Sequence, residues 1–209
     1  MIILSHRGLW KSADEKNTAA AFQRSFDLGF GTETDVRDYK GELVISHDIP
    51  AGGELSFADF LKLLRGRDLP LAINIKADGL ADKIQETLQK FQHANYFTFD
   101  MSLPDLVYQV QKGLTVFTGL SDLNRSAPLL EKSAGVWLDA FESLWYTPAI
   151  ILDLLNQGKK VCAVSADLHK RDNAAQWKML KDSGLHRQDG VLLCTDFPEK
   201  AGEYFSISP

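Results

Sequence analysis

The stretch Ile2-Ile3-Leu4-Ser5-His6-Arg7-Gly8 joins a short apolar run to a histidine and an arginine. Similar apolar runs, rich in β-branched and aromatic residues, recur along the chain and alternate with longer amphipathic stretches. This alternation is typical of repeated βα units around a parallel sheet. We expect strands at Ile2–Ser5, Gly31–Val36, Leu71–Ile75, Tyr96–Phe99, Thr115–Thr118, Gly135–Leu138, Lys160–Val164 and Gly190–Leu193.

The stretches between these strands have the apolar spacing of helices. We expect helices at Thr18–Leu28, Phe57–Leu64, Leu80–Phe91, Leu103–Gln111, Pro148–Asn156 and Ala174–Ser183. Ser56, Ser102 and the Thr147-Pro148 pair are helix-start signals, and an extra hairpin strand is expected near Leu43–Ser46. The sequence therefore predicts an α/β fold, a TIM (β/α)8 barrel with a short insertion after the second strand.

The chain has the length of one domain. No Pro- or Ser-rich linker, charge block or low-complexity segment divides its 209 residues, so residues 1–209 are expected to fold as one barrel domain. That length is somewhat below the roughly 250 residues typical of such barrels. We therefore expect a trimmed barrel.

Composition and charge exclude several classes of function. Hydrophobic residues make up 44% and charged residues 24% of the chain, as in ordinary globular proteins. A net charge of −5 argues against nucleic acid as a partner, which leaves small molecules. The first apolar run is too short for a signal peptide and no run could span a membrane, so we expect a cytoplasmic protein. The oligomeric state is left open.

Several reactive side chains receive no chemical role from the sequence. Cys162 and Cys194 lie in expected strands without metal-ligand spacing, so we expect buried free thiols. His93, His169 and His186 stand in polar surroundings outside any motif and are expected at the surface.

Polar side chains stand near the ends of expected strands, two residues apart. Glu33 and Asp35 would point to one face of a strand, where two carboxylates repel unless a cation lies between them. Asn74 and Lys76 repeat the step on the next strand, offering an amide oxygen to the ion and an ammonium to an anionic substrate. Oxygen ligands favour Mg²⁺ or Ca²⁺, so Glu33, Asp35 and Asn74 are the candidate metal ligands.

Two histidines and an arginine complete the candidate site. His6 and His47 are the expected proton carriers, one activating the nucleophile and the other protonating the leaving oxygen. Arg7 offers a planar fork for phosphate oxygens and, with Lys76, would stabilise charge on phosphorus. Asp48 is expected to orient His47 or to cap a turn, and Trp137, Trp145 and Asp139 could shape the mouth of the site or pack as a wall.

The order of these motifs resembles the N-terminal signature of the glycerophosphodiester phosphodiesterases. The resemblance runs through His6-Arg7-Gly8, Asn17-Thr18, Ala21-Phe22, Gly29, Glu33-x-Asp35-Val36, Gly41 and His47-Asp48, and continues at Ile73–Lys76, Phe99-Asp100 and Gly190–Pro198. It implies a barrel that hydrolyses phosphodiesters with a divalent metal. His6 and His47 match the catalytic histidines, Glu33 and Asp35 the metal ligands, and Arg7 and Lys76 the phosphate-contacting positions. Related phosphoinositide phospholipases C use paired histidines in a similar way, sometimes through a cyclic phosphate.

The chain resembles a shortened and divergent member. Asn74 stands where the family has a third acidic ligand, which predicts weaker metal binding. Lys16 replaces the family's glutamate beside Asn17, and Val164 replaces a tryptophan of the site wall. Only Ile49 to Pro70 stands where these enzymes carry a longer insertion over the glycerol end of the substrate.

The sequence supports one main hypothesis and two rivals. The main hypothesis is a phosphoric diester hydrolase acting on a glycerophosphodiester or a related lipid or polyol head-group ester. The first rival is a catalytically impaired barrel that binds a phosphate ligand or a partner, and it rests on the substitutions at Lys16, Asn74 and Val164. The second is another reaction class on the same barrel, because fold does not fix chemistry.

Overall fold

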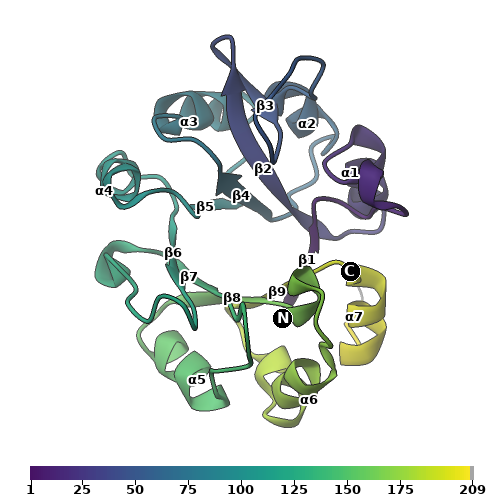
Figure 1. The fold of residues 1–209 in the computed structure, drawn as a ribbon, viewed down its shortest axis with the longest axis vertical. Helices are drawn as coiled ribbons and strands as arrows, with labels where there is room; N and C mark the ends of the chain where they lie inside the picture. The colour runs from purple at the N-terminus through teal and green to yellow at the C-terminus, as the bar shows by residue number, and fades with distance from the viewer. Residues whose placement is uncertain (208–209) are drawn as a thin grey trace.

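The computed structural model describes residues 1–207, which form one parallel barrel sheet surrounded by helices (Figure 1). The barrel strands follow the sheet order β5-β4-β2-β1-β9-β8-β7-β6, and every neighbouring pair on this path is parallel. Their bounds are β1 (Ile2–His6), β2 (Gly31–Tyr39), β4 (Leu71–Ile75), β5 (Tyr96–Phe99), β6 (Phe117–Leu120), β7 (Gly135–Leu138), β8 (Lys160–Val164) and β9 (Val191–Thr195). The TIM-barrel fold expected from the sequence is confirmed.

The barrel closes through a short contact between β5 and β6. The amide of Thr98 donates to the carbonyl oxygen of Thr115 at 2.9 Å, and Thr98 forms a single parallel bridge with Val116. Regular pairing of β6 begins only at Phe117, where it meets β7. Strand β6 therefore starts two residues later than the sequence suggested, because Thr115 and Val116 precede its regular pairing with β7.

Strand β2 is the longest and continues beyond the barrel as a hairpin with β3 (Glu42–Ile45), which is antiparallel to it (Figure 1). The expected hairpin strand is confirmed. It carries the chain over the rim of the barrel to His47, two residues past the end of β3.

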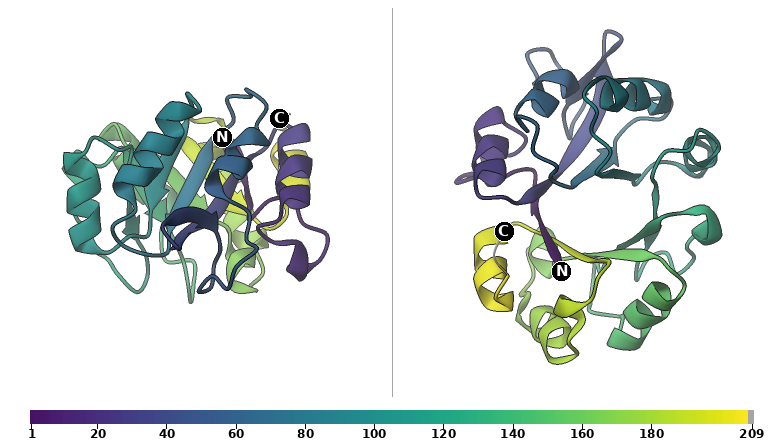
Figure 2. Two further views of the ribbon diagram at one scale, coloured as in Figure 1. Left: turned by 90° about the horizontal axis from the view of Figure 1, so that it is seen from above. Right: turned by 180° about the vertical axis from the view of Figure 1, so that it is seen from behind.

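An outer ring of helices covers the sheet (Figures 1 and 2). The helices are α1 (Ala19–Asp27), α2 (Phe57–Lys62), α3 (Ala81–Lys90), α4 (Leu103–Gln111), α5 (Pro148–Asn156), α6 (Ala174–Asp182) and α7 (Pro198–Phe205). Ser56 and Ser102 accept from the amides of Asp59 and Asp105, as their helix-start pattern indicates. Helix α7 was not expected from the sequence, although Pro198 at its first position is a start signal.

The trimming expected from the length falls mainly after β6. The connection to β7 contains only the 3-10 helix η2 (Leu130–Lys132) where the other barrel strands are followed by α-helices. Further 3-10 helices are η1 (Ala13–Glu15), η3 (Ala166–His169) and η4 (Leu185–Arg187). Among residues 1–207, no helix has both the length and the apolar character needed to cross a bilayer.

The barrel interior is filled by side chains that alternate along the strands. Leu4, Phe99, Trp137 and Cys194 belong to one buried interior cluster, in which the Phe99 and Trp137 rings stack with centroids 3.8 Å apart. Packed layers of this kind make the barrel a core and leave space for ligands only at its carboxyl end. The site therefore rests on a rigid floor.

The structure settles the expectations for the remaining cysteines and histidines. Cys162 and Cys194 are buried free thiols, as expected. His186 was expected at the surface, but it is buried against α6, where its Nδ1 lies 3.3 Å from the carbonyl oxygen of Leu180. His93 is partly buried, with Nε2 3.1 Å from the carbonyl oxygen of Asn95. The surface expectation was wrong for His186 because its apolar neighbours come from segments distant in sequence.

Replacing the interior ring of Phe99 by Ala should lower the free energy of unfolding by about 3–5 kcal/mol, because it removes buried apolar contacts and leaves a cavity. Urea unfolding followed by circular dichroism measures the change. Ile49→Ala is the control: that side chain is 85% exposed and its removal should cost less than about 0.5 kcal/mol. Equal effects of the two substitutions would contradict this description of the core.

Candidate functional site

The site is built where parallel strands end next to one another. The register sets His6 of β1 beside Glu33 of β2, and Asp35 of β2 beside Asn74 of β4. Side chains at paired positions of neighbouring strands point to the same face of the sheet, here the barrel interior. The structure thus brings together the polar positions that the sequence singled out on β1, β2 and β4.

The turn after β1 is shaped for close packing. Arg7 and Gly8 both have positive φ angles, 61° and 84°. A Cβ atom on Gly8 would lie 2.8 Å from the backbone of Ala21 in α1, so only glycine fits this position. The tight turn holds Arg7 at the rim directly after His6, and the amide of Gly8 is tied to Thr32 Oγ1 at 3.0 Å.

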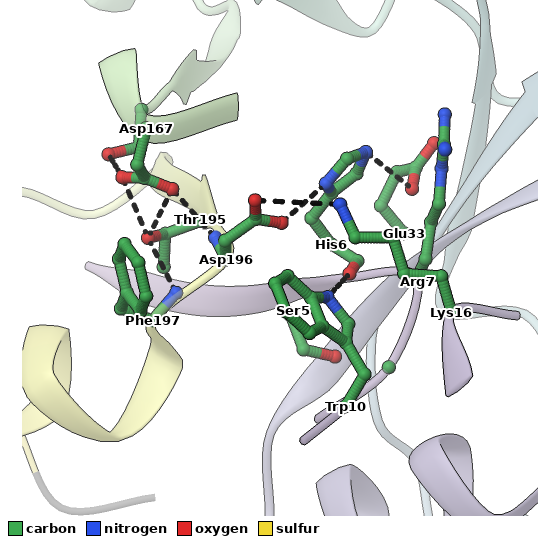
Figure 3. Close-up of polar contacts among 12 residues, drawn as sticks. Ser5, His6, Arg7, Trp10, Lys16, Glu33, Asp167, Thr195, Asp196 and Phe197 are labelled. Carbon is green, nitrogen blue, oxygen red and sulfur yellow. Dashed lines mark hydrogen bonds and ion pairs between the residues drawn. The ribbon is translucent and has the colours of Figure 1, made fainter. Parts of the chain in front are cut away.

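His6 lies between two carboxylates (Figure 3). Its Nδ1 is 2.7 Å from Asp196 Oδ1, and its Nε2 is 3.8 Å from Glu33 Oε2. A carboxylate accepts hydrogen bonds, so His6 Nδ1 carries a proton and donates a hydrogen bond to Asp196. In the neutral ring Nε2 is then the nitrogen with a free lone pair. Burial lowers the pKa of His6, although the hydrogen bond to Asp196 opposes this change. The lowered pKa favours the neutral ring.

Asp196 is itself held by a buried carboxylate. Asp167 accepts from the amide of Asp196 at 2.8 Å and from Thr195 Oγ1 at 3.1 Å (Figure 3). It also contacts Ser165 Oγ. No role for Asp167 or Asp196 was expected from the sequence. The Thr-Asp-x-Pro resemblance at Thr195–Pro198 was the available signal, but the contact with His6 joins residues 190 positions apart.

Asp35 collects three cationic or amide groups. Arg7 Nε lies 2.8 Å from Asp35 Oδ2 as an ion pair outside hydrogen-bond geometry, and Asn17 Nδ2 donates to the same oxygen at 2.8 Å. Lys76 Nζ is 3.5 Å from the other oxygen, Oδ1, and 3.6 Å from Asp100 Oδ2. Two expected phosphate-contacting groups therefore pair with an expected metal ligand.

Glu33 has a less polar environment. It is fully buried, and its Oε1 accepts from Asn74 Nδ2 at 3.3 Å. Burial raises the pKa of Glu33 to about 8, the Asp35 carboxylate adds to the rise, and Arg7 and Lys76 oppose it. An added cation would relieve this cost of burying the carboxylate.

The candidate metal ligands fit a hard cation in one respect. Within residues 1–207, Glu33 Oε2, Asp35 Oδ1 and Asn74 Oδ1 are buried oxygens without a hydrogen-bond partner. Buried polar atoms normally find partners, so unpaired oxygens from adjacent strands indicate a missing one. The same described residues hold no group of three or more His, Cys, Asp or Glu side chains with metal-binding geometry. The donor set is therefore two carboxylates and one amide.

A cavity of about 480 Å³ opens above these groups. Its lining includes His6, Arg7, Glu33, His47, Asn74 and Lys76. His47 stands at the rim with 48% of its side chain exposed, and its Nδ1 is 2.8 Å from Asp48 Oδ1. This contact is the one required if Asp48 orients His47, one of the two roles expected for it.

Two of the divergent positions, Asn74 and Val164, line this cavity, and Lys16 lies beside Asp196. Val164 lines it where the resemblance implies a tryptophan. Lys16 Nζ is 3.6 Å from Asp196 Oδ2 and 4.4 Å from the centroid of the Trp10 ring. Glu15 contacts Arg24 and the amide of Lys11, so it does not supply the carboxylate that the family carries at this turn. Lys16 lies beside Asp196 where the family resemblance implies a glutamate.

The far wall of the cavity contains a histidine that was expected elsewhere. His169, expected at the surface, lines the cavity and lies 2.7 Å from Asp139 Oδ1 through its Nε2. Trp137 and Asp139 both line it, whereas Trp145 packs beside Tyr146 and donates to the carbonyl oxygen of Asp139. His169 belongs to no sequence motif, so only the fold reveals its place.

Comparison with solved structures gives a consistent result. The chain aligns with a glycerophosphodiester phosphodiesterase from Agrobacterium tumefaciens over 99% of both chains, with a TM-score of 0.73 and 18% identity. The fold is that of these phosphodiesterases. A phosphodiesterase from Oleispira antarctica, solved with its product sn-glycerol-3-phosphate, has a TM-score of 0.70 at 16% identity and covers 99% of this chain and 97% of its own.

A third structure extends the likeness. The glycerophosphoryl diester phosphodiesterase of Parabacteroides distasonis aligns with the whole of this chain and 87% of its own, at a TM-score of 0.69 and 14% identity. The resemblance to glycerophosphodiester phosphodiesterases is thus confirmed at the level of the fold. Neither a protein-family model nor a curated protein matches the sequence.

Replacing Asp167 by Ala should lower the free energy of unfolding by about 2–4 kcal/mol, because the buried Thr195 and the partly buried Asn173 and Asp196 lose their acceptor. Thermal and urea unfolding measure this loss. Asp182→Ala is the matched control, since among residues 1–207 the exposed Asp182 pairs with the exposed Lys178 alone, and its loss should change stability by less than about 1 kcal/mol. A stability of Asp167→Ala close to that of the control would rule out this network.

Proposed function

We propose that the chain is a metal-dependent phosphodiesterase that hydrolyses a glycerophosphodiester or a related lipid or polyol head-group ester. The observation that carries this proposal is the placement of His6, which Asp196 holds through Nδ1 and which lines the cavity beside Arg7 and Lys76. An oriented imidazole next to two cationic groups suits attack on a phosphorus centre. The fold shared with known phosphodiesterases supports the same conclusion.

His6 fits the role of general base. Because Nδ1 is committed to Asp196, Nε2 is the nitrogen that can accept a proton from an attacking water as its oxygen bonds to phosphorus. His47, at the rim, would donate a proton to the leaving alcohol oxygen as the second phosphorus–oxygen bond breaks. If a hydroxyl of the substrate attacks in place of water, the same proton transfers yield a cyclic phosphate.

Arg7 and Lys76 would bind the phosphate oxygens. Both line the cavity and each keeps part of its side chain exposed, so an anion can reach them without unfolding the site. Their pairing with Asp35 holds them in place before substrate arrives. The planar guanidinium can contact two phosphate oxygens at once, and the ammonium adds a third contact.

Glu33, Asp35 and Asn74 would hold Mg²⁺ or Ca²⁺ through their unpaired oxygens. When bound, such an ion would withdraw charge from the phosphate oxygens and favour attack at phosphorus. Asn74 gives this site one negative charge fewer than three carboxylates would. Arg7 and Lys76 already offset the charges of Glu33 and Asp35, so we expect weak metal binding in the absence of substrate.

A second hollow suggests how the substrate lies. A shallower groove of about 570 Å³ adjoins the hairpin and contains Lys16, Asn17 and Asp48. Arg7 and His47 line both this groove and the cavity. We place the phosphate at this junction, with one alcohol portion of the diester in the cavity and the other along the groove.

His6→Ala should lower turnover by roughly 10²- to 10⁴-fold, the usual cost of a lost acid or base. Hydrolysis of bis(p-nitrophenyl) phosphate and glycerophosphocholine, with Mg²⁺, Ca²⁺ or EDTA, provides the measurement. His93→Ala is the control, because His93 lies in another hollow, near α2 and the start of β5. Turnover by His6→Ala at the level of the wild type would remove His6 from the mechanism.

Asn74→Glu should tighten binding of Mg²⁺ or Ca²⁺ by roughly tenfold or more, because ligand charge helps to set affinity. Isothermal titration calorimetry of the free protein measures this directly. Asn156→Glu, at the exposed last residue of α5, is the control for a simple change in net charge. Unchanged affinity in Asn74→Glu would argue against a metal at Glu33 and Asp35.

One observation favours the rival proposal of a phosphate-binding module without turnover. Lys16 stands beside Asp196, the residue that holds His6, where the family resemblance implies a glutamate. The rival predicts that inorganic phosphate binds the wild type while neither substrate is hydrolysed under any metal condition. Restored turnover in Asn74→Glu would identify the loss of the third carboxylate as the cause.

A further inference from the structure

The wall of the cavity opposite the candidate phosphate site carries a second histidine–carboxylate pair. Asp139 follows β7 directly, and His169 ends the 3-10 helix η3 after β8. The two side chains meet at 2.7 Å, between His169 Nε2 and Asp139 Oδ1, and both line the cavity. Neither residue takes part in the proposed hydrolysis.

The bonding of this pair leaves hydrogen-bonding capacity for a ligand. Asp139 Oδ1 also accepts from the amide of Ala140 at 2.6 Å, so the carboxylate is the acceptor and His169 Nε2 is the donor. Within residues 1–207, His169 Nδ1 and Asp139 Oδ2 make no hydrogen bond. The pair therefore presents a ring nitrogen and a carboxylate oxygen, a combination that can satisfy alcohol hydroxyl groups as donors and as acceptors.

The position of His169 is fixed by the segment that also orders the catalytic face. η3 contains Asp167, which holds the amide of Asp196 and so the partner of His6. Beyond it, Arg171 contacts the carbonyl oxygen of Ala140, which ties the segment to the end of β7. The segment from Ser165 to Arg171 thus fixes the distance between His6 and the His169–Asp139 pair. A fixed distance between the groups that bind a ligand is needed to select ligands by length and shape.

Apolar and amide side chains complete this wall. Trp137 and Phe141 line it, and the Phe141 ring centroid lies 4.7 Å from that of His169. Asn124 also lines the cavity. Of its two side-chain polar atoms, only Oδ1 forms hydrogen bonds within the described residues, and it accepts them from Ser126. Aromatic surface for carbon–hydrogen faces, with polar groups for hydroxyls, suits an alcohol that carries several hydroxyl groups.

We propose that the His169–Asp139 pair binds hydroxyl groups of the substrate's alcohol portion and makes the site selective for hydroxyl-bearing phosphoesters. This inference rests on the proposed function, because it places the phosphate at Arg7 and Lys76. The carboxylate fixes the ring, and the ring and carboxylate together contact the hydroxyls. A site built to hydrogen-bond a hydroxyl discriminates strongly against a ligand that lacks it, because its own polar groups are then left unpaired.

Binding of two phosphomonoesters tests the proposal without requiring turnover. Isothermal titration calorimetry would compare sn-glycerol 3-phosphate with ethyl phosphate, which has the phosphate but no hydroxyl groups. We expect the wild type to bind glycerol phosphate roughly tenfold more tightly. In His169→Phe, which keeps a ring against Phe141, that ratio should fall below about threefold while the Kd for ethyl phosphate stays unchanged.

Matched variants separate this role from a general effect on the fold. His93→Phe makes the same substitution in the hollow near α2 and should keep the wild-type ratio. Asp139→Asn retains the shape of the side chain and should lower the affinity ratio as His169→Phe does. It replaces His169→Phe in the test if His169→Phe does not fold. Equal wild-type affinity for both esters, or an unchanged ratio in both cavity variants, would overturn the inference. Failure of ethyl phosphate to bind at all would refute the phosphate site itself, and the inference with it.

Discussion

The register between parallel strands is the constraint on which this site depends. One-residue steps in a strand reverse the direction of a side chain, so His6, Glu33, Asp35 and Asn74 share the barrel interior only because β1, β2 and β4 pair as they do. A shift of one residue in β2 would turn both of its carboxylates towards α1 and α2. The closed ring of strands and its packed interior prevent such a shift.

The buried charges of the site are balanced within a small volume. Glu33 and Asp35 are buried within β2, and Arg7 and Lys76 approach from the turn after β1 and the end of β4. Charges buried in this way must be paired, because desolvation otherwise outweighs folding energy. Asn74 adds no charge to this group, whereas a third carboxylate would add one more negative charge to a buried site.

Two histidine–carboxylate pairs, His6–Asp196 and His169–Asp139, stand around one cavity. Each carboxylate accepts a hydrogen bond from one ring nitrogen, so the other ring nitrogen is the one that can contact a ligand. The segment from Ser165 to Arg171 braces both pairs through Asp167 and His169.

The sequence by itself determined the strands, most of the helices and the half of the site near the N-terminus. Apolar runs followed by polar pairs are local patterns, and these patterns alone assign His6, Arg7, Glu33, Asp35, Asn74 and Lys76 to strand ends. Helix α7 was missed although Pro198 is a local helix-start signal. The late start of β6 was missed because the contacts of Thr115 and Val116 with Thr98 form only when the barrel closes. Only the tertiary structure decided that Asp196 holds His6 and that His169 meets Asp139. These contacts join residues 190 and 30 positions apart, and no local pattern encodes a meeting that barrel closure alone creates.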